Sequence, residues 1–428
     1  MKGLKIAVIG AGSTYTPELI DGFIQRKNEL PVDRFYMMDI DEERLEIVGD
    51  MAGRMLKANS MDCKVIKTES LEAALHKADF VIVQIRVGKL DARVKDEKIP
   101  LKYGMIGQET TGIGGFMKGM RTIPELMKIA GMIEKYCPDA WMINFSNPSG
   151  MLAEAVLNHT QTKMIGLCNV PVYMIRSLKP LTDGFGDVTI DYVGLNHLSW
   201  ITGVYCDGVN ILPEKLMEVD NSGKLKNIPN SEFDAGLLKT INAYPCGYLT
   251  YFYYRDRQLK YLLKEEKTRG EICREIENEL LLLYQNPGLA EKPPMLDKRG
   301  GAMYSEAAVS LISAIYNDKN EIHVVNTKNN GALDFMDKND VVEISCRVNK
   351  NGVFPISPKG PVNEHIKGMM RMIKTYEKHA VKAGLYGDYN EAVKAVLIHP
   401  LANDYNQIKG ALDELMEAHR YYLPQFYR

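Results

Sequence analysis

The chain has 428 residues, a mass of 48.3 kDa and a formal net charge of -2 at pH 7. Lys and Arg total 53 against 55 Asp and Glu, so no basic surplus favours binding to nucleic acid or to an anionic membrane surface. The length suits two to three domains of roughly 100–200 residues, and no apolar run approaches the ~20 residues that span a bilayer. We therefore expect neither nucleic acid nor a membrane as a partner.

The seven cysteines are widely scattered and form no Cys-x-x-Cys pair. An odd number without regular spacing is typical of reduced thiols in a cytoplasm rather than of a disulfide framework. The N-terminal segment has only a short apolar run before a glycine-rich turn, which indicates a first β-strand and not a signal peptide. We expect a cytoplasmic protein.

Predicted strands and helices alternate through about residue 170. The apolar run Leu4–Ile9 predicts a strand that is buried on both faces of a parallel sheet. Later strands are expected at 34–38, 80–85, 141–145 and 164–167. Helices are expected at about 17–25 and after a capping-box pattern that begins at Thr122. This alternation predicts a doubly wound α/β domain over residues 1–170.

The second half of the chain has a different pattern. Antiparallel strands are expected at 188–195 and 200–206, the second closing on an Asp-Gly turn. Further elements are a helix at 271–284, strands at 322–325 and 341–348, and a mostly helical region from about 363 to 422. We expect an α+β domain over residues 171–428. Since no Gly/Ser-rich or Pro-rich linker separates the halves, we expect them to share an interface and a cleft.

The first strand leads into a partial dinucleotide-binding fingerprint. Gly10 and Gly12 permit a tight turn and the close approach of a pyrophosphate to backbone N–H groups at a helix N-terminus, and Ser13 and Thr14 follow them. The third fingerprint position is a tyrosine instead of a glycine. Asp39 ends the next strand, where a carboxylate accepts the ribose hydroxyls of NAD. The pattern favours an NAD site over the alternative, a plain βα turn with a surface aspartate.

Cys168 and His197 each lie next to a predicted strand. A thiolate and an imidazole together suit a borderline-soft divalent metal with open positions for a substrate. The alternative is a buried core cysteine and a hydrogen-bonded core histidine.

Two further segments carry polar residues. Asn147 closes a predicted strand, and doubly wound folds bind their ligands at the carboxyl ends of strands. A tyrosine-rich stretch extends from residue 244 to residue 254, and packing in a core or interface is the alternative for most of its rings.

Over nearly its whole length the chain resembles glycoside hydrolase family 4, the NAD- and divalent-metal-dependent glycosidases. The resemblance rests on IGAGSTYTPELI, GQETTGIGG, NFSNP, CNVP, GLNHLSW and YLTYF, in that order. CNVP looks like the 6-phospho-β-glucosidase branch, because 6-phospho-α-glucosidases have an aspartate at the position of Asn169. The resemblance implies an α/β fold with a Rossmann-like N-terminal domain and hydrolysis of 6-phospho-β-glucosides, such as cellobiose 6-phosphate, to glucose 6-phosphate and an aglycone.

The resemblance also implies an unusual reaction course. Members of this family are exceptions to the two-carboxylate scheme of glycoside hydrolysis. The sugar is oxidised at C3 with NAD+, deprotonated at C2, cleaved by elimination, hydrated and reduced again, with a divalent metal, here expected to be Mn²⁺, as the Lewis acid. No net oxidation results.

Roles for individual residues follow from matching positions. Cys168 as a thiolate and His197 as a neutral imidazole would be the metal ligands. Tyr248 aligns with the base at C2. A free phenol has a pKa of about 10, so it needs a nearby cation, most simply the metal, to favour the phenolate. Glu109 matches a position that assists this tyrosine, and we interpret it as part of a hydrogen-bonded proton relay.

Substrate contacts are expected from four further positions. Arg93 is suited to bidentate recognition of a 6-phosphate dianion, and Arg269 offers a second phosphate contact. Asn147 matches a substrate-binding position, and Asn169 is placed to bind sugar hydroxyls near the metal. We expect a homodimer or homotetramer.

Three other functions remain open from the sequence. A dehydrogenase of the 2-hydroxyacid type also joins a dinucleotide domain to an α+β half, but it uses a His–Asp pair, and the motif around His197 contains no aspartate. A non-catalytic NAD sensor would not need Cys168, His197 and Tyr248 together. A 6-phospho-α-glucosidase is the alternative within the same family.

Overall fold

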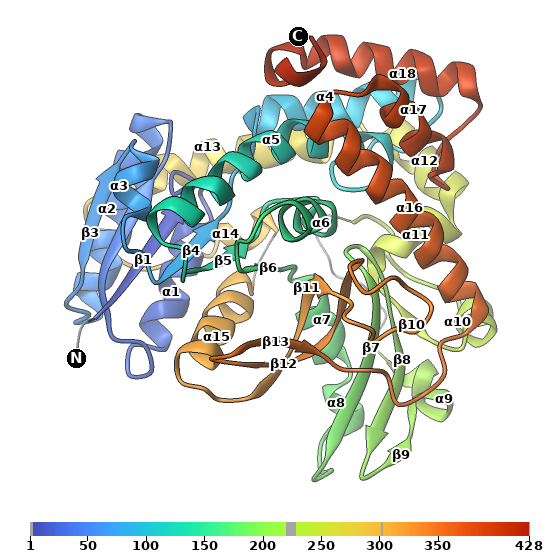
Figure 1. Ribbon diagram of the computed structural model, residues 1–428, viewed down its shortest axis with the longest axis horizontal. Coiled ribbons are helices and arrows are strands. Elements are labelled where there is room, and N and C mark those ends of the chain that lie inside the picture. Colours follow the sequence, from blue (N-terminus) through green and yellow to red (C-terminus); the bar gives the residue numbers. More distant parts are fainter. Residues whose placement is uncertain (1–2, 220–227, 301–302, 428) are drawn as a thin grey trace.

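The computed structural model describes residues 3–219, 228–300 and 303–427 (Figure 1). Within these residues the strands form one 13-stranded mixed sheet in the order β10-β8-β7-β12-β11-β6-β5-β4-β1-β2-β3, with β9 paired to β8 and β13 to β12. The strands of the N-terminal half are β1 (Leu4–Ile9), β2 (Val32–Met38), β3 (Lys64–Thr68), β4 (Phe80–Val83), β5 (Trp141–Asn144) and β6 (Met164–Gly166). Neighbours among them pair in parallel.

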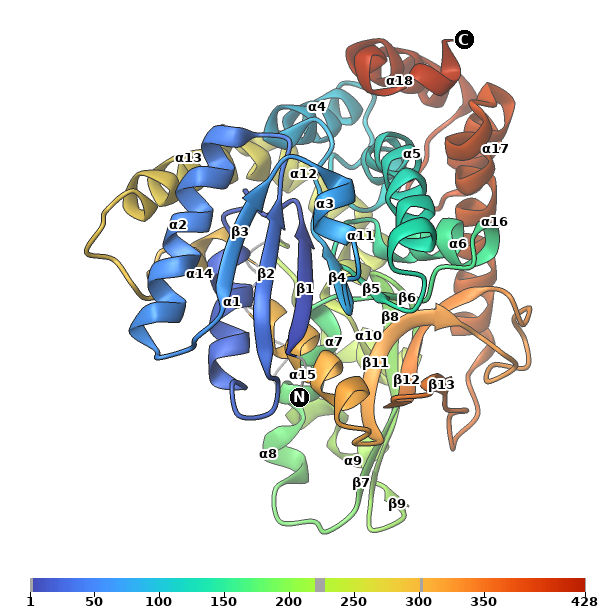
Figure 2. The same cartoon turned by 60° about the vertical axis from the view of Figure 1, so that its left-hand side comes forward.

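Helices cover both faces of this parallel half (Figure 2). On one side α1 (Thr16–Gln25) packs on α2 (Glu42–Ala58), and on the other α5 (Gly112–Tyr136) packs on α3 (Leu71–Leu75) and α6 (Ser149–His159). Every residue of β1 is buried, as its apolar run predicts for a strand that is covered on both faces. The predicted doubly wound fold is confirmed, and the carboxyl ends of its strands meet at one edge.

The second half continues the same sheet. Its strands are β7 (Val188–Leu195), β8 (Leu198–Cys206), β9 (Val209–Asn210), β10 (Tyr244–Pro245), β11 (Glu321–Lys328), β12 (Val341–Asn349) and β13 (Gly352–Pro355). β11 joins β6 through the antiparallel pair of Asn326 and Gly166. β7 and β8 form the predicted antiparallel hairpin. The α+β character of this half is confirmed, whereas the boundary between domains at residue 170 stays a prediction.

Helices from late in the sequence pack on the N-terminal half. α13 (Arg269–Tyr284) contacts α2 and α4 (Lys89–Lys102), and α15 (Tyr304–Tyr316) contacts α1. α16 (Glu364–Tyr386) packs on α5 and α6, while α18 (Tyr405–Ala418) packs on α4 at the top of Figure 1. The two halves are therefore interlocked, and side chains from both surround one site.

The other helices are short, apart from two of ten residues. They are α7 (Val170–Ser177), α8 (Lys179–Thr182), α9 (Leu212–Lys215), α10 (Ala235–Ile241), α11 (Thr250–Tyr253), α12 (Arg255–Lys264), α14 (Leu296–Arg299), α17 (Tyr389–Ile398) and the 3₁₀ turns Leu216–Glu218, Gly247–Leu249, Arg420–Tyr422 and Pro424–Phe426. Among the described residues, none of the helices combines the length and apolar character needed to cross a membrane.

The helix predicted to begin at Thr122 starts earlier, because α5 continues unbroken through Pro124. A proline has no N–H, so the carbonyl of Met120 lacks its usual helical donor. The side chain of Gln425 replaces that donor, and its Nε2 lies 2.9 Å from the Met120 oxygen. The hydroxyl of Thr122 caps no helix and donates to a carbonyl one turn earlier, at 2.7 Å. The predicted helix start was wrong. The residue that replaces the missing donor and lets the helix run through Pro124 lies near the C-terminal end of the chain, where no local pattern reveals it.

Candidate active site

A cavity of about 940 Å³ lies at the carboxyl ends of the parallel strands, and Gly10, Gly12, Ser13 and Asp39 line it. The N–H groups of Gly10 and its neighbour donate to the Met38 carbonyl, both at 2.9 Å, which turns the chain sharply after β1. Gly10 has φ +85°, and a Cβ there would lie 2.9 Å from a backbone carbonyl oxygen. Only glycine fits this turn, as the fingerprint predicts.

Asp39 faces the glycine-rich turn directly. Its Oδ2 accepts the Gly12 N–H at 2.8 Å, and its Oδ1 accepts the Asp41 N–H at 3.1 Å. A Cβ on Gly12 would lie 2.9 Å from the same Oδ2, so any larger residue would displace the carboxylate. Burial raises the pKa of Asp39 above its usual range. The turn and the carboxylate thus form one unit in the wall of the cavity.

Thr14 does not line this cavity. It is fully buried, its hydroxyl lies 3.4 Å from Glu277 Oε1, and its carbonyl accepts the Tyr284 hydroxyl at 2.9 Å. Both partners lie on α13. The structure therefore places Thr14 where it links the glycine-rich turn to the second half, and its predicted contact with NAD stays a prediction.

Several cavity residues were not among those that the sequence analysis singled out. Tyr15, at the third fingerprint position, lies under the guanidinium of Arg299, 5.0 Å from its ring centroid. Tyr421 and Tyr422 line the cavity from the C-terminal end, and a Cβ on Gly88 would approach a Tyr422 ring carbon to 3.2 Å. Tyr15 belongs to the fingerprint segment, but no local pattern indicates Arg299, Tyr421 and Tyr422, because they reach the cavity only through the packing of the two halves.

Cys168, His197 and Tyr248 lie together although they come from three separate segments. Cys168 follows β6, and its Sγ lies 3.4 Å from His197 Nε2. His197 occupies the tight turn between β7 and β8 with φ +64°. Its ring stacks on that of Tyr248, with centroids 3.8 Å apart and an angle of 14° between the planes. The three residues form one buried cluster, as the metal-and-base hypothesis requires.

Burial controls the charges of this cluster. It raises the pKa of the Cys168 thiol and of the Tyr248 phenol well above their ordinary values, and it lowers the pKa of His197 to about 3. Without a cation the three groups are therefore neutral at pH 7. A bound divalent cation would favour the thiolate and the phenolate by direct attraction.

The donor atoms of the cluster fit a metal. Bonds of about 2.3 Å to sulfur and about 2.1 Å to nitrogen are compatible with one ion between two donors at this separation. Among the residues that the structure describes, the buried His197 Nδ1 has no hydrogen-bond partner. In the described part of the chain, no group of three or more His, Cys, Asp and Glu side chains is placed to hold a metal. Further coordination positions would thus fall to water or to a substrate.

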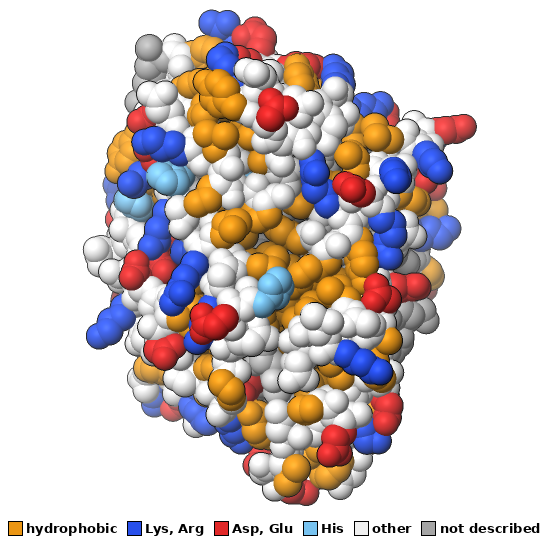
Figure 3. Space-filling view, turned by 90° about the vertical axis from the view of Figure 1, so that its right-hand side faces the viewer, with side chains coloured by type: hydrophobic (Ala, Val, Ile, Leu, Met, Phe, Trp, Pro, Cys, Tyr) orange, Lys and Arg blue, Asp and Glu red, His pale blue; other side chains and the backbone are white. Residues whose placement is uncertain are grey.

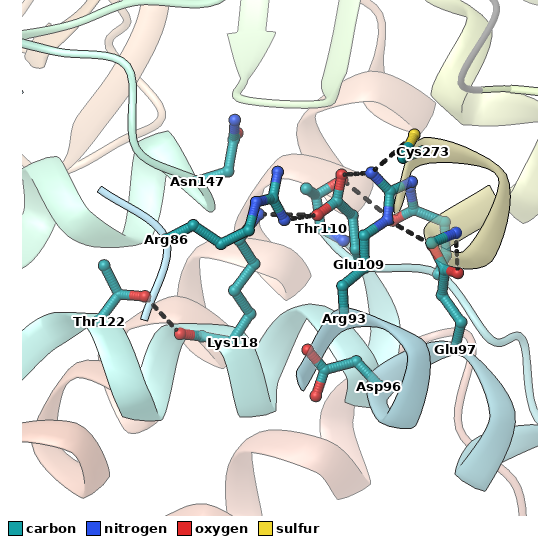
Figure 4. Close-up of polar contacts among 12 residues, drawn as sticks. Arg86, Arg93, Asp96, Glu97, Glu109, Thr110, Lys118, Thr122, Asn147 and Cys273 are labelled. Carbon is teal, nitrogen blue, oxygen red and sulfur yellow. Dashed lines mark hydrogen bonds and ion pairs between the residues drawn. The ribbon is translucent and has the colours of Figure 1, made fainter. Parts of the chain in front are cut away.

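Glu109 is surrounded by cations (Figure 4). Arg93 Nη1 lies 2.8 Å from Oε1, Lys118 Nζ lies 2.9 Å from Oε2, and Arg86 also pairs with Oε2. These charges hold the pKa of Glu109 well below its usual range despite its burial. Burial and the charge of Arg86 lower the pKa of Lys118 to about 7. The next residue, Thr110, hydrogen-bonds Tyr248, so Glu109 neighbours the predicted base without a direct bond to it.

The predicted substrate residues lie in different surroundings. Asn147 lines the cavity near Arg86 (Figure 4), and its buried Oδ1 has no hydrogen-bond partner within the described part of the chain. Arg93 is 2% exposed and is held by Glu97 as well as by Glu109. Arg86, which follows β4, lines the cavity together with Arg44, Arg121 and Arg299, whereas Arg93 does not line it. The rule that ligands bind at the carboxyl ends of strands would have found Arg86.

Asn169 and Arg269 lie at two separate places. Asn169 is the N-cap residue of α7, and its Oδ1 lies 3.9 Å from Cys168 Sγ. Arg269 begins α13 and donates to the carbonyls of Lys298 and Arg299 at 2.9 and 3.1 Å. Asn169 therefore adjoins the predicted metal site, whereas the substrate contact of Arg269 stays a prediction.

A model of the family 4 glycosyl hydrolases matches residues 5–183, and a model of the C-terminal domain of the same family matches residues 192–402. The chain belongs to glycosyl hydrolase family 4. Its relatives in this family include the probable 6-phospho-beta-glucosidase of Bacillus subtilis, 45% identical over 100% of this chain and 98% of that protein. The 6-phospho-beta-glucosidase of Escherichia coli is 39% identical over 99% of this chain and 97% of that protein.

A solved member of family 4 shares the fold along the whole chain. The 6-phospho-beta glucosidase from Thermotoga maritima with NAD and glucose-6-phosphate has a TM-score of 0.91 at 37% identity, covering 98% of this chain and 99% of that one. A second structure of that enzyme, with manganese, NAD+ and glucose-6-phosphate, has a TM-score of 0.89 at 36% identity, with the same coverage of both chains. The resemblance inferred from the motifs is confirmed, and this family 4 chain is a glycoside hydrolase.

Proposed function

We propose that this chain hydrolyses 6-phospho-β-glucosides, such as cellobiose 6-phosphate, to glucose 6-phosphate and an aglycone, with NAD+ and a divalent metal, Mn²⁺, as cofactors. The named relatives and the molecules bound in the Thermotoga maritima enzyme support the substrate class and both cofactors. The observation that carries the proposal is the buried cluster of Cys168, His197 and Tyr248, with 3.4 Å between Sγ and Nε2 and 3.8 Å between the two ring centroids.

NAD+ would occupy the cavity at the carboxyl ends of the strands. When bound, it supplies the hydride acceptor that returns the hydride at the end of the cycle. The backbone N–H groups that follow Gly12 at the start of α1 suit the pyrophosphate. Asp39, already in the cavity wall, suits the ribose hydroxyls.

The metal would be held by Cys168 and His197. When bound, it supplies a Lewis acid for the oxygens at C2 and C3 of the sugar. Asn169 adjoins these ligands and offers an amide to a sugar hydroxyl. An amide cannot donate a proton as a general acid, so Asn169 supports the β-glucosidase reaction over the α-glucosidase alternative.

Tyr248 would remove the C2 proton. Its hydroxyl has Thr110 as a partner and lies beside the metal ligands, so a cation there would favour the phenolate. Glu109 would assist proton transfer to and from Tyr248, because it stays anionic among its three cationic neighbours. One of them, Lys118, has a pKa of about 7 and therefore exchanges protons near neutral pH. Thr110 would then link the base to this charged group.

The sugar phosphate would bind on the Asn147 side of the cavity. Asn147 and Arg86 both line the cavity there, and Arg86 carries the charge that a dianion needs. Arg86 also pairs with Glu109, but its side chain is 27% exposed, whereas Arg93 is buried between Glu97 and Glu109 and in the present geometry acts by holding Glu109. The contact predicted for Arg269 completes the proposed set.

The dehydrogenase alternative is less well supported. Such an enzyme pairs its histidine with an aspartate, whereas His197 faces a thiol through Nε2 and, in the described residues, has no partner at Nδ1. A sensor would not require a base stacked on a metal ligand. These contacts favour the hydrolase.

Assembly and location are also part of the proposal. Hydrophobic side chains gather around a histidine on the face shown in Figure 3, which supports a homodimer or homotetramer that covers this face. All seven cysteines are free thiols, which supports a cytoplasmic location.

One assay tests the proposed function. The enzyme is incubated with NAD+, Mn²⁺, a reductant and a chromogenic 6-phospho-β-glucoside, while aglycone release and NADH absorbance are followed together. We expect aglycone release without NADH accumulation, because the hydride returns to the sugar. Stoichiometric NADH would indicate a dehydrogenase, and the absence of both signals would indicate a sensor.

A further inference from the structure

Glu343 is a fully buried carboxylate in the centre of the sheet. It lies on β12 opposite Gly194 of β7, close to the turn that carries His197. Its Oε1 accepts the side-chain amides of Asn196 and Asn326, both at 3.0 Å, and its Oε2 accepts the Tyr192 hydroxyl at 3.1 Å. No pattern in the sequence indicates Glu343, because nothing in its strand distinguishes it from a solvent-facing position.

All the side chains that hydrogen-bond this carboxylate are uncharged. They are Asn196, Asn326 and Tyr192. Several other buried acids have a cation: Arg121 pairs with Asp96, and Lys374 pairs with Glu154 and Glu377, whereas Asp191 accepts two backbone N–H groups. Burying a carboxylate without a cation is costly. The contrast indicates that a positive charge belongs near Glu343.

Asn196 connects Glu343 to both predicted metal ligands. Its side chain acts on Cys168, where it opposes the rise that burial causes in the pKa of the thiol, and its Oδ1 accepts the Ser149 N–H at 3.1 Å. The next residue is His197, whose φ of +64° is unfavourable for a side-chain-bearing residue and persists only where surrounding contacts hold it. Glu343 thus fixes the residue that positions the thiol on one side and the imidazole on the other.

We propose that Glu343 is the buried counter-charge of the metal centre and the positioning residue for its two ligands. The inference rests on the proposed function for the assignment of Cys168 and His197 as ligands. The negative charge of Glu343 partly balances the positive charge of the divalent metal, with the side-chain amide of Asn196 between them. The metal in turn supplies the cation that Glu343 lacks. Losing an outer partner of this kind typically weakens metal affinity about 10–100-fold.

The test measures Mn²⁺ affinity and thermal stability in the full-length, NAD+-loaded enzyme. Glu343→Gln keeps the shape and removes the charge. Its carbonyl oxygen still accepts the amides of Asn196 and Asn326, and the Tyr192 hydroxyl, 2.7 Å from the Ser199 hydroxyl, has an acceptor to turn to. We expect Mn²⁺ binding, followed by the paramagnetic resonance signal of the free ion, to weaken about 10–100-fold. The melting temperature without metal should be unchanged or raised.

Two further variants make the result specific. Tyr192→Phe removes one hydrogen bond but keeps the charge, so it should bind Mn²⁺ as the wild type does. Cys168→Ser should lose Mn²⁺ binding. If Cys168→Ser binds normally, the ligand assignment in the proposed function is wrong, whatever Glu343 does.

Two outcomes would overturn the role of Glu343 while leaving the proposed function intact. One is a Glu343→Gln enzyme with wild-type Mn²⁺ affinity and a lowered metal-free melting temperature, which would show that the carboxylate only supports the fold. The other is a Glu343→Gln variant that does not fold at any Mn²⁺ concentration. A residue that serves only as the counter-charge of the metal is not needed for folding when no metal is bound.

Discussion

The rings of His197 and Tyr248 stack face to face, 3.8 Å between centroids and 14° from parallel. An ion bound to the Nε2 edge of His197 would therefore lie beside the phenol that is to lose its proton. Because burial alone raises the pKa of Tyr248, the ion and the base act together. Because the metal ligand and the base are in contact, their contributions to activity can be told apart only by mutating each residue separately.

Cys168→Ser should abolish Mn²⁺-dependent turnover and leave NAD+ affinity nearly unchanged. Cys168 is not among the residues that line the NAD cavity. A serine hydroxyl replaces the soft thiolate with a weak ligand. Dialysis against a chelator should reproduce the defect in the wild type, and added Mn²⁺ should restore only the wild type. A variant equally active at low Mn²⁺ would remove Cys168 from the ligand set.

Asp39→Ala should weaken NAD+ binding about 10–100-fold, since hydrogen bonds to a charged acceptor contribute about 1.5–3 kcal/mol. Asp39 also accepts the Gly12 N–H, so part of any loss could arise from the turn. Asp39→Asn is the control, because it retains this acceptor and loses the charge. A fluorescence titration with NAD+ measures both variants. If Asp39→Asn binds as the wild type does, the carboxylate supports only the turn.

Tyr248→Phe should keep the ring stack, bind NAD+ and Mn²⁺, and lose aglycone release by about 10²–10⁴-fold, as expected for removal of a general base. A substrate deuterated at C2 should exchange its label with solvent in the wild type and not in the variant. Tyr251 is the matched control, because it is buried and its ring centroid lies 6.4 Å from that of Tyr248. Loss of exchange in Tyr251→Phe but not in Tyr248→Phe would assign the base to Tyr251.

His399→Asn should make the protein more resistant to mild acid. Burial lowers the pKa of His399 from 6.5 to about 3. Between these values only the unfolded chain binds the proton, so stability falls as the pH decreases, by about 2 kcal/mol at about pH 5 for this group. An asparagine oxygen can still accept the Leu401 N–H that now bonds Nδ1 at 3.1 Å. Urea unfolding at pH 7 and pH 5 tests this, and equal pH dependence in both proteins would contradict it.

Gln425→Ala should destabilise the protein by about 1–3 kcal/mol, because it leaves the buried Met120 carbonyl without a donor. Pro124→Ala restores an N–H one turn later in α5 and should offset most of this loss in the double variant. A double-mutant cycle of unfolding free energies measures the coupling. Strictly additive effects would mean that Gln425 does not replace the missing helical donor.

The chain's local patterns determine much of the fold and the identities of the central residues. β1 and its glycine-rich turn are predictable because a continuous apolar run and a positive φ at Gly10 are local properties. Cys168 and His197 were singled out beside predicted strands, whereas the role of Tyr248 in the 3₁₀ turn Gly247–Leu249 came from the resemblance to family 4. The antiparallel pairing of β7 and β8 was expected from the strand patterns at 188–195 and 200–206, whereas the predicted Asp-Gly turn joins β8 to β9.

Tertiary structure decided which charges and donors meet. Glu109 obtains its three cations from other elements, and Asp39 obtains the Gly12 N–H and Glu343 the amide of Asn196 from segments far apart in the sequence. α5 passes through Pro124 because Gln425 arrives from the C-terminal end. Hydrogen bonds and ion pairs act over a few ångströms in space regardless of separation along the chain. A sequence therefore names the groups that do the chemistry, whereas packing sets their protonation and their partners.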